Sequence, residues 1–102
     1  MAVIAITNDT FELQVLKAEK PVLLDFWAQW CGPCRLLSPA VDEVAAERED
    51  ILVGKVNVDE EPELAERFQI MSIPTLILFR NGQIVNTAVG AMPKEDVLAL
   101  LD

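Results

Sequence analysis

The sequence predicts an α/β fold in which a mixed five-stranded sheet is flanked by four helices. Two observations lead to this prediction. Apolar runs typical of strands alternate with segments of helical periodicity over the first two thirds of the chain, as in β-α-β units. Asn81-Gly82, which lies between two further strand-like runs, is the strongest short signal of a β-hairpin. We expect the parallel crossovers to be right-handed.

The first half of the chain supplies two strands and a short helix. Val3–Ile6 is apolar and reads as a short strand. Asn8 or Asp9 can cap a helix over Thr10–Leu16, where apolar residues recur at helical spacing. Val22–Ala28 is almost entirely apolar, which is typical of a central strand covered on both faces.

A long helix and a third strand follow. Helical spacing of apolar residues extends from Pro33 to about Arg48, and Pro39 removes one backbone hydrogen bond inside that helix. Leu52–Val58 is the next strand, and Pro62 opens a brief helix through Phe68.

The C-terminal third predicts an antiparallel pair and a last helix. The hairpin strands are Thr75–Arg80 and Gln83–Val89. Pro93 opens the final helix, and Glu95 and Asp96 fall in its first turn, where acidic side chains are favourable. Because no linker, repeat or low-complexity tract interrupts the pattern, we expect residues 1–102 to form one domain.

Composition excludes several classes of function. The net charge of −9 argues against nucleic acids and anionic membrane surfaces, which are bound by clustered Lys and Arg. No apolar run approaches the roughly 18 residues of a membrane span. The N-terminus has no basic segment and only a short apolar stretch, so no export is predicted. We therefore expect a cytoplasmic, reducing compartment and a monomer, and we expect no bound cofactor or metal.

The most informative feature is the run Trp30-Cys31-Gly32-Pro33-Cys34, which contains the only cysteines of the chain. Two intervening residues let the sulfurs reach bonding distance and open and close reversibly. The motif lies between a strand-like run and a helical one, which places Cys31 at a helix N-terminus. Unpaired N–H groups there favour the thiolate, so we expect its pKa to lie below the free value of about 8.5. Cys34 is expected to be more buried and to act as the resolving thiol.

Other interpretations of the cysteine pair are weaker. A zinc site needs four ligands, and the chain has no histidine and no third cysteine, so a closed site would use carboxylates or a second chain. A purely structural disulfide is possible, but so short a loop removes little entropy from the unfolded chain. A non-catalytic binding module, and an oxidant or isomerase that runs the same exchange in reverse, remain as alternative functions.

The chain resembles the thioredoxin family over essentially its whole length. The residues that carry the resemblance are Asp25-Phe26-Trp27-Ala28, Trp30 to Arg35, Pro39, Lys55-Val56-Asn57-Val58-Asp59, Ile73-Pro74-Thr75, Phe79-Arg80-Asn81-Gly82 and Val89-Gly90-Ala91. The resemblance implies the thioredoxin fold and a protein-disulfide reductase. It also implies a thioredoxin reductase, linked to NADPH or to ferredoxin, that recharges the pair, and disulfide-containing client proteins.

Family resemblance also assigns roles to residues outside the motif. Asp25 lies within the most apolar strand, so we expect it to be buried with a raised pKa, and the resemblance implies that it takes the proton of Cys34. The resemblance places Lys55 beside Asp25, although an ordinary exposed lysine is an equally open interpretation.

The resemblance further implies a cis Ile73–Pro74 bond packed against the cysteines and a client-binding surface. That surface comprises Trp30, Gly32, Pro33, Ile73, Pro74 and Gly90. Trp27 is expected to belong to the core. One departure from the family pattern is Gln69, which stands where a helix-terminating glycine would be easier.

Overall fold

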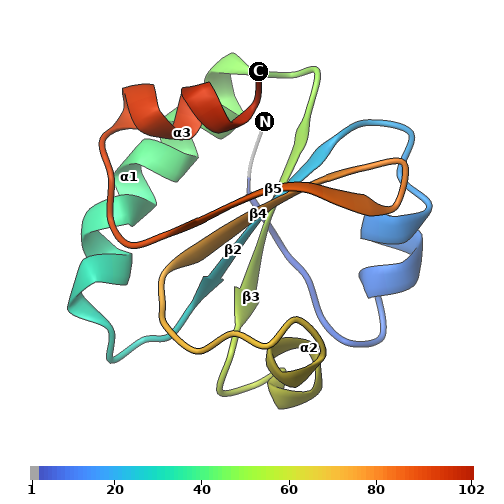
Figure 1. Cartoon of the computed structure of the whole chain (residues 1–102), viewed down its shortest axis with the longest axis horizontal. Coiled ribbons are helices and arrows are strands. Elements are labelled where there is room, and N and C mark those ends of the chain that lie inside the picture. The colour runs from blue at the N-terminus through green and yellow to red at the C-terminus, as the bar shows by residue number, and fades with distance from the viewer. Residues whose placement is uncertain (1–2) are drawn as a thin grey trace.

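The computed structural model describes residues 3–102 and confirms the predicted α/β architecture (Figure 1). Five strands form one mixed sheet in the order β1-β3-β2-β4-β5. The first three strands in this order are parallel, whereas β4 is antiparallel to both of its neighbours. The strands are β1 (Ile4–Ala5), β2 (Val22–Trp27), β3 (Leu52–Asn57), β4 (Thr75–Arg80) and β5 (Gln83–Val89).

Helices cover both faces of the sheet (Figure 1). One face packs against α1 (Gly32–Glu47) and α3 (Lys94–Leu100), and the other against η1 (Glu12–Leu16) and α2 (Pro62–Arg67). Alternation along β2 divides its side chains between the layers: Leu23 lies in the core under α1, and Leu24 lies in the opposite core. The prediction of a doubly covered central strand is therefore confirmed.

The first helix differs from its predicted form. It is a π-helical turn rather than an α-helix, because the Lys17 N–H donates to the carbonyl of Glu12 at 2.9 Å, five residues earlier. Asn8 and Asp9 do not cap it. The hydroxyls of Thr7 and Thr10 accept one another's backbone N–H groups instead, at 3.3 and 3.0 Å. This reciprocal pair satisfies the donors that a single cap was expected to satisfy.

The other elements lie close to their predicted ranges. Both hairpin strands match, and their turn has φ 53° at Asn81 and 77° at Gly82, the two positive values that a type I′ turn requires. Helix α1 continues through Pro39 without ending there. Strand β1 is shorter than predicted, and Pro93 lies just before α3 as its N-cap rather than within it.

Gln69, which follows α2, has φ 53°. It therefore adopts the left-handed conformation for which a glycine was expected to be easier. That conformation costs a residue with a Cβ roughly 1–2 kcal/mol. We expect Gln69→Gly to raise the free energy of unfolding by about 0.5–1 kcal/mol, because the relief of strain is offset partly by the added entropy of the unfolded chain. Urea unfolding measures the change. Asn81→Gly, at the same φ, is the control and should gain less, since asparagine tolerates this region; equal gains would contradict the strain argument.

Candidate active site

The cysteine pair lies where β2 passes into α1. Cys31 is the N-cap of α1, with extended backbone (φ −91°, ψ 108°), and its Sγ accepts the backbone N–H of Cys34 at 3.2 Å. Gly32 and Pro33 form the first turn, and Pro33 needs no hydrogen-bond partner there. The two cysteines are joined as a disulfide with their Cα atoms 5.3 Å apart. The predicted helix-terminal position of Cys31 is confirmed.

The pair is enclosed rather than projecting. Both cysteines are 3% exposed, so the expectation that Cys34 would be the more buried of the two is wrong. The reason is tertiary. Val58 and Ile73, from distant parts of the chain, pack against the pair, and the Cys31 Sγ lies 3.7 Å from the carbonyl oxygen of Ile73. Residues far from the motif thus decide how much of each sulfur is exposed.

The loop before β4 and the end of β5 complete the surroundings of the pair. The Ile73–Pro74 bond is cis, as expected, and the Pro74 carbonyl accepts the N–H of Gly90 at 2.8 Å. Gly90 has φ 102°, which a residue with a Cβ rarely adopts, and nothing lies within 4 Å of the position a Cβ would take. Its glycine is therefore required by the backbone and leaves open space beside Pro74.

Trp30 is 68% exposed beside the cysteines, and its indole N–H donates to Asp59 at 2.8 Å. A pocket of about 170 Å³ opens next to it. The pocket is lined by Trp30, Val58, Ile70, Met71, Ser72 and Ile73. The sequence did not single out Asp59 as the indole's partner or Met71 as part of this pocket. No local pattern could have done so, because the contacts join segments far apart in the chain. Trp27, expected in the core, is only half-buried.

Asp25 is buried within β2, at 1% exposure, and its Oδ1 has no hydrogen-bond partner among residues 3–102. Burial raises the pKa of this carboxyl from 3.8 to about 6. The positive charge of Lys55 opposes the shift, and the negative charge of Asp42 adds to it. A carboxyl with this pKa can accept and release a proton near neutral pH.

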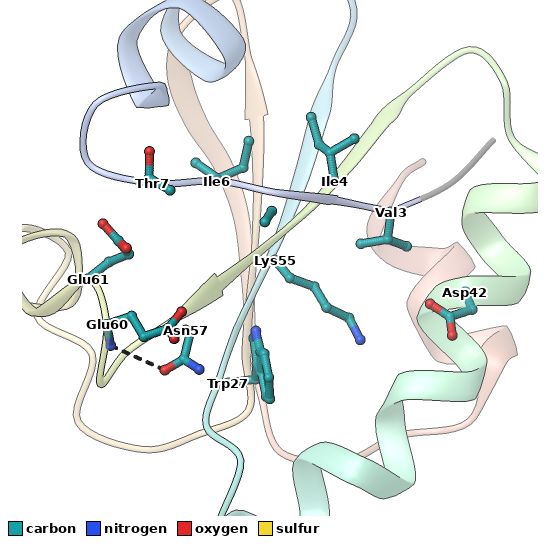
Figure 2. Close-up of a pocket in the computed structure, with 11 residues that line it drawn as sticks. Val3, Ile4, Ile6, Thr7, Trp27, Asp42, Lys55, Asn57, Glu60 and Glu61 are labelled. Carbon is teal, nitrogen blue, oxygen red and sulfur yellow. Dashed lines mark hydrogen bonds between the residues drawn. The ribbon is translucent and has the colours of Figure 1, made fainter.

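Lys55 lies opposite Asp25 in the pairing of β2 with β3, but its ammonium binds elsewhere. The side chain reaches across Trp27 toward α1 (Figure 2). Its Nζ donates to the Ser38 hydroxyl at 2.7 Å and lies 5.8 Å from the centre of the Trp27 ring. The lysine borders a groove of about 510 Å³ that runs along β1 and β3. Lys55 is thus half-buried and acts on Asp25 through its charge, without a direct ion pair.

Among residues 3–102, no group of three or more His, Cys, Asp or Glu side chains is arranged to hold a metal ion. No helix in the same range has the length and apolar character needed to cross a membrane.

The Thioredoxin family model matches residues 2–102. The chain belongs to the thioredoxin family. Thioredoxin 1 of Synechococcus elongatus is 52% identical over 99 residues, covering 96% of this chain and 92% of that protein. The thioredoxin of Acidithiobacillus ferridurans is 47% identical over 99% of this chain and 94% of its own length. The thioredoxin of Mycobacterium tuberculosis is 51% identical over 95% of this chain and 84% of its own length.

Membership of the thioredoxin family and the cysteine pair together establish the type of activity. The chain is a protein-disulfide oxidoreductase of the thioredoxin type, with Cys31 and Cys34 as its redox-active disulfide. Family membership implies a thioredoxin reductase and disulfide-containing clients as partners.

The raised pKa of Asp25 predicts a pH-dependent cost to stability. Since the pKa is raised in the folded state, ionised Asp25 disfavours folding; the penalty grows as pH rises from 3.8 to about 6 and is constant above that. We expect Asp25→Asn to raise the free energy of unfolding by about 3 kcal/mol at pH 8 and by much less at pH 4. Urea unfolding at both values measures the difference. A gain that does not depend on pH would contradict burial of the charge.

Proposed function

We propose that Cys31 is the nucleophile and Cys34 the resolving thiol of a dithiol–disulfide exchange that reduces client proteins. The observation that carries this assignment is the N-cap position of Cys31, whose sulfur receives the N–H of Cys34 at the positive end of α1. A sulfur so placed is favoured as a thiolate, which is the attacking species. Cys34 lies within the helix, and among residues 3–102 no N–H donates to its sulfur.

The exchange has two steps. In the first, the Cys31 thiolate attacks one sulfur of the client disulfide, forms a mixed disulfide, and releases the other client sulfur as a thiolate that takes up a proton. In the second, Cys34 loses its proton and attacks the Cys31 sulfur. The mixed disulfide breaks, the second client sulfur leaves as a thiolate that takes up a proton, and a disulfide forms between Cys31 and Cys34. Two electrons have passed to the client.

Asp25 is the proposed acceptor of the Cys34 proton. Its support is the buried carboxyl with a pKa of about 6, which is mostly ionised at neutral pH and so can accept a proton. Lys55 acts on this carboxyl through its charge rather than through a direct ion pair, since its ammonium donates to Ser38. We therefore propose that the role of Lys55 is to lower the pKa of Asp25 through its positive charge.

The proposed client-binding surface surrounds the pair. It comprises Trp30, Gly32, Pro33, Ile73, Pro74 and Gly90. Trp30 is exposed, Ile73 is half-buried and Gly90 leaves open space, so an extended client segment can approach the sulfurs from this side. Pro74 is buried, and its contribution is to shape the backbone beside Ile73.

The remaining elements of the proposal concern the cellular setting. We propose that residues 1–102 act as a single domain and a monomer in a reducing cytoplasm, with no bound cofactor and no role for nucleic acid or membrane. The net charge of −9 supports the last two points. A thioredoxin reductase returns two electrons to the Cys31–Cys34 disulfide after each cycle.

Single cysteine substitutions test the order of attack. Cys34→Ser leaves the nucleophile but removes the resolving thiol, so covalent mixed disulfides with clients should accumulate. Cys31→Ser should trap none. Non-reducing electrophoresis after mixing each variant with a disulfide-containing protein measures the adducts. Equal trapping by both variants would show that the nucleophile is wrongly assigned, and exchange by the double serine variant would rule out cysteine chemistry altogether.

The charges around the pair predict a reductant rather than an oxidant. Strong stabilisation of the thiolate makes a pair oxidising, but Gly32 and Pro33 carry no charge and the chain has no histidine. Arg35 is the nearest cation in the sequence, but its guanidinium donates to the Gln29 carbonyl at 2.6 Å. The helix terminus then supplies at most about 2 kcal/mol, the upper value for a partly buried site. We expect a reduction potential well below the endoplasmic-reticulum range of roughly −180 to −210 mV. Equilibration with glutathione buffers measures it, and a value above that range would assign the reverse reaction.

A further inference from the structure

A second hollow lies on the far side of the loop that walls the active-site pocket. Its volume is about 320 Å³, in the lower range of pockets that bind ligands. The loop residues Ile70, Met71 and Ser72 line both hollows, so one short segment separates them. The second hollow is here called the annex. Besides the shared loop, it is lined by Phe68, Gln69, Thr75, Ile77, Ile84, Thr87 and Val89.

The annex is uncharged on a strongly acidic protein. None of the residues that line it is ionisable, although the chain carries a net charge of −9. Several of its apolar side chains are exposed: Met71 is 93% exposed and Ile84 is 49% exposed. Exposed apolar side chains gathered around a hollow mark an interaction surface, whereas scattered ones do not.

The annex continues the surface on which clients are proposed to bind. Trp30 and Ile73 line the pocket beside the cysteines, and Met71 stands at the wall between that pocket and the annex. A client chain whose disulfide lies at Cys31 and whose adjoining residues pass over Met71 would enter the annex.

We propose that the annex binds an apolar, uncharged side chain from the segment that flanks the disulfide of a client protein, and so selects among clients. This inference rests on the proposed client reduction at Cys31. The absence of charge in the annex matches a neutral segment and disfavours a basic or an acidic one. The net charge of −9 opposes a second copy of the chain as the occupant.

The contact is made by side chains rather than by addition of a strand to the sheet. The pairing of β4 with β5 is interrupted between Leu78 and Phe79, and the irregularity leaves Val85 without a partner in the register. The Thr87 N–H is taken up by the side-chain oxygen of Asn86 at 3.0 Å. Both features disfavour main-chain pairing of a client strand with β5, the edge strand of the sheet.

Peptide substrates test the proposal. Two synthetic peptides contain the same cyclic disulfide; one carries a short tail of Leu, Val and Phe and the other a Gly-Ser tail of equal length, attached at either end in turn. Steady-state kinetics of the full chain, recharged by dithiothreitol, gives KM and kcat. Because burial of one apolar side chain is worth about tenfold in affinity, the apolar tail should lower KM about tenfold without changing kcat.

Neighbouring substitutions on β5 provide a matched pair. Ile84 lines the annex and is 49% exposed, whereas the adjacent Val85 is 50% exposed and does not line it. Ile84→Lys should lose the tenfold advantage of the apolar tail, and Val85→Lys should keep it. Both should reduce a small aryl disulfide at the unaltered rate. If Ile84→Lys fails to fold by circular dichroism, Thr87→Lys replaces it.

Each other outcome overturns the proposal. Equal KM values for the two peptides, or an advantage that Ile84→Lys retains, show that the annex does not bind clients. If sedimentation shows dimers of the unaltered chain and Ile84→Lys dissociates them, the annex binds a second copy of the chain instead. Loss of the aryl-disulfide reaction in the unaltered chain contradicts the proposed function itself, whereas its retention with equal KM values contradicts only the annex.

Discussion

Strand β2 holds the other elements of the fold in place. It is hydrogen-bonded to β3 on one side and β4 on the other, and helices cover both of its faces. Its apolar side chains, apart from the half-buried Trp27, are completely buried, so neither its register nor its direction can shift without exposing one core. Because Cys31 follows this strand closely, the fixed strand also fixes the start of α1. The sulfur is therefore held at the helix terminus by the core of the protein.

The same strand accounts for the electrostatics of the site. Asp25 occupies a position whose alternation places it in the layer under α1, where water is excluded. An apolar side chain in this position would stabilise the fold more. The raised pKa of Asp25 reflects the cost of burying its charge. Lys55 lies opposite on β3 and lowers that pKa, while Asp42 of α1 raises it. The pKa of about 6 is the balance of burial and these two charges.

The surface around the cysteines combines rigid and adjustable parts. Ile73, Pro74 and Gly90 are fixed by the hydrogen bond between the β4 entry and the β5 exit. By contrast, Met71 is almost fully exposed and has a flexible, polarisable side chain, which suits contact with varied partners. The left-handed Gln69 sets the direction in which the loop leaves α2.

The chemistry and the order of elements could be predicted from the amino-acid sequence. The cysteine spacing, the neutral Gly32-Pro33 pair and the Asn81-Gly82 turn act within a few residues, so their local backbone preferences could be read directly. The apolar run of β2 likewise predicted burial of Asp25, and the family resemblance supplied the cis Ile73–Pro74 bond.

Contacts between distant residues could not be predicted in this way, because they depend on how the whole chain folds. The cover that Val58 and Ile73 place over the cysteines, the Trp30–Asp59 hydrogen bond and the Lys55–Ser38 contact each join segments that are distant in sequence. The π-turn at η1 also depended on context, since Phe11 and Val15 are both held in the core. Local propensity fixes the conformation of a segment, whereas strand register and helix packing fix its neighbours, and those arise only when the whole chain has folded.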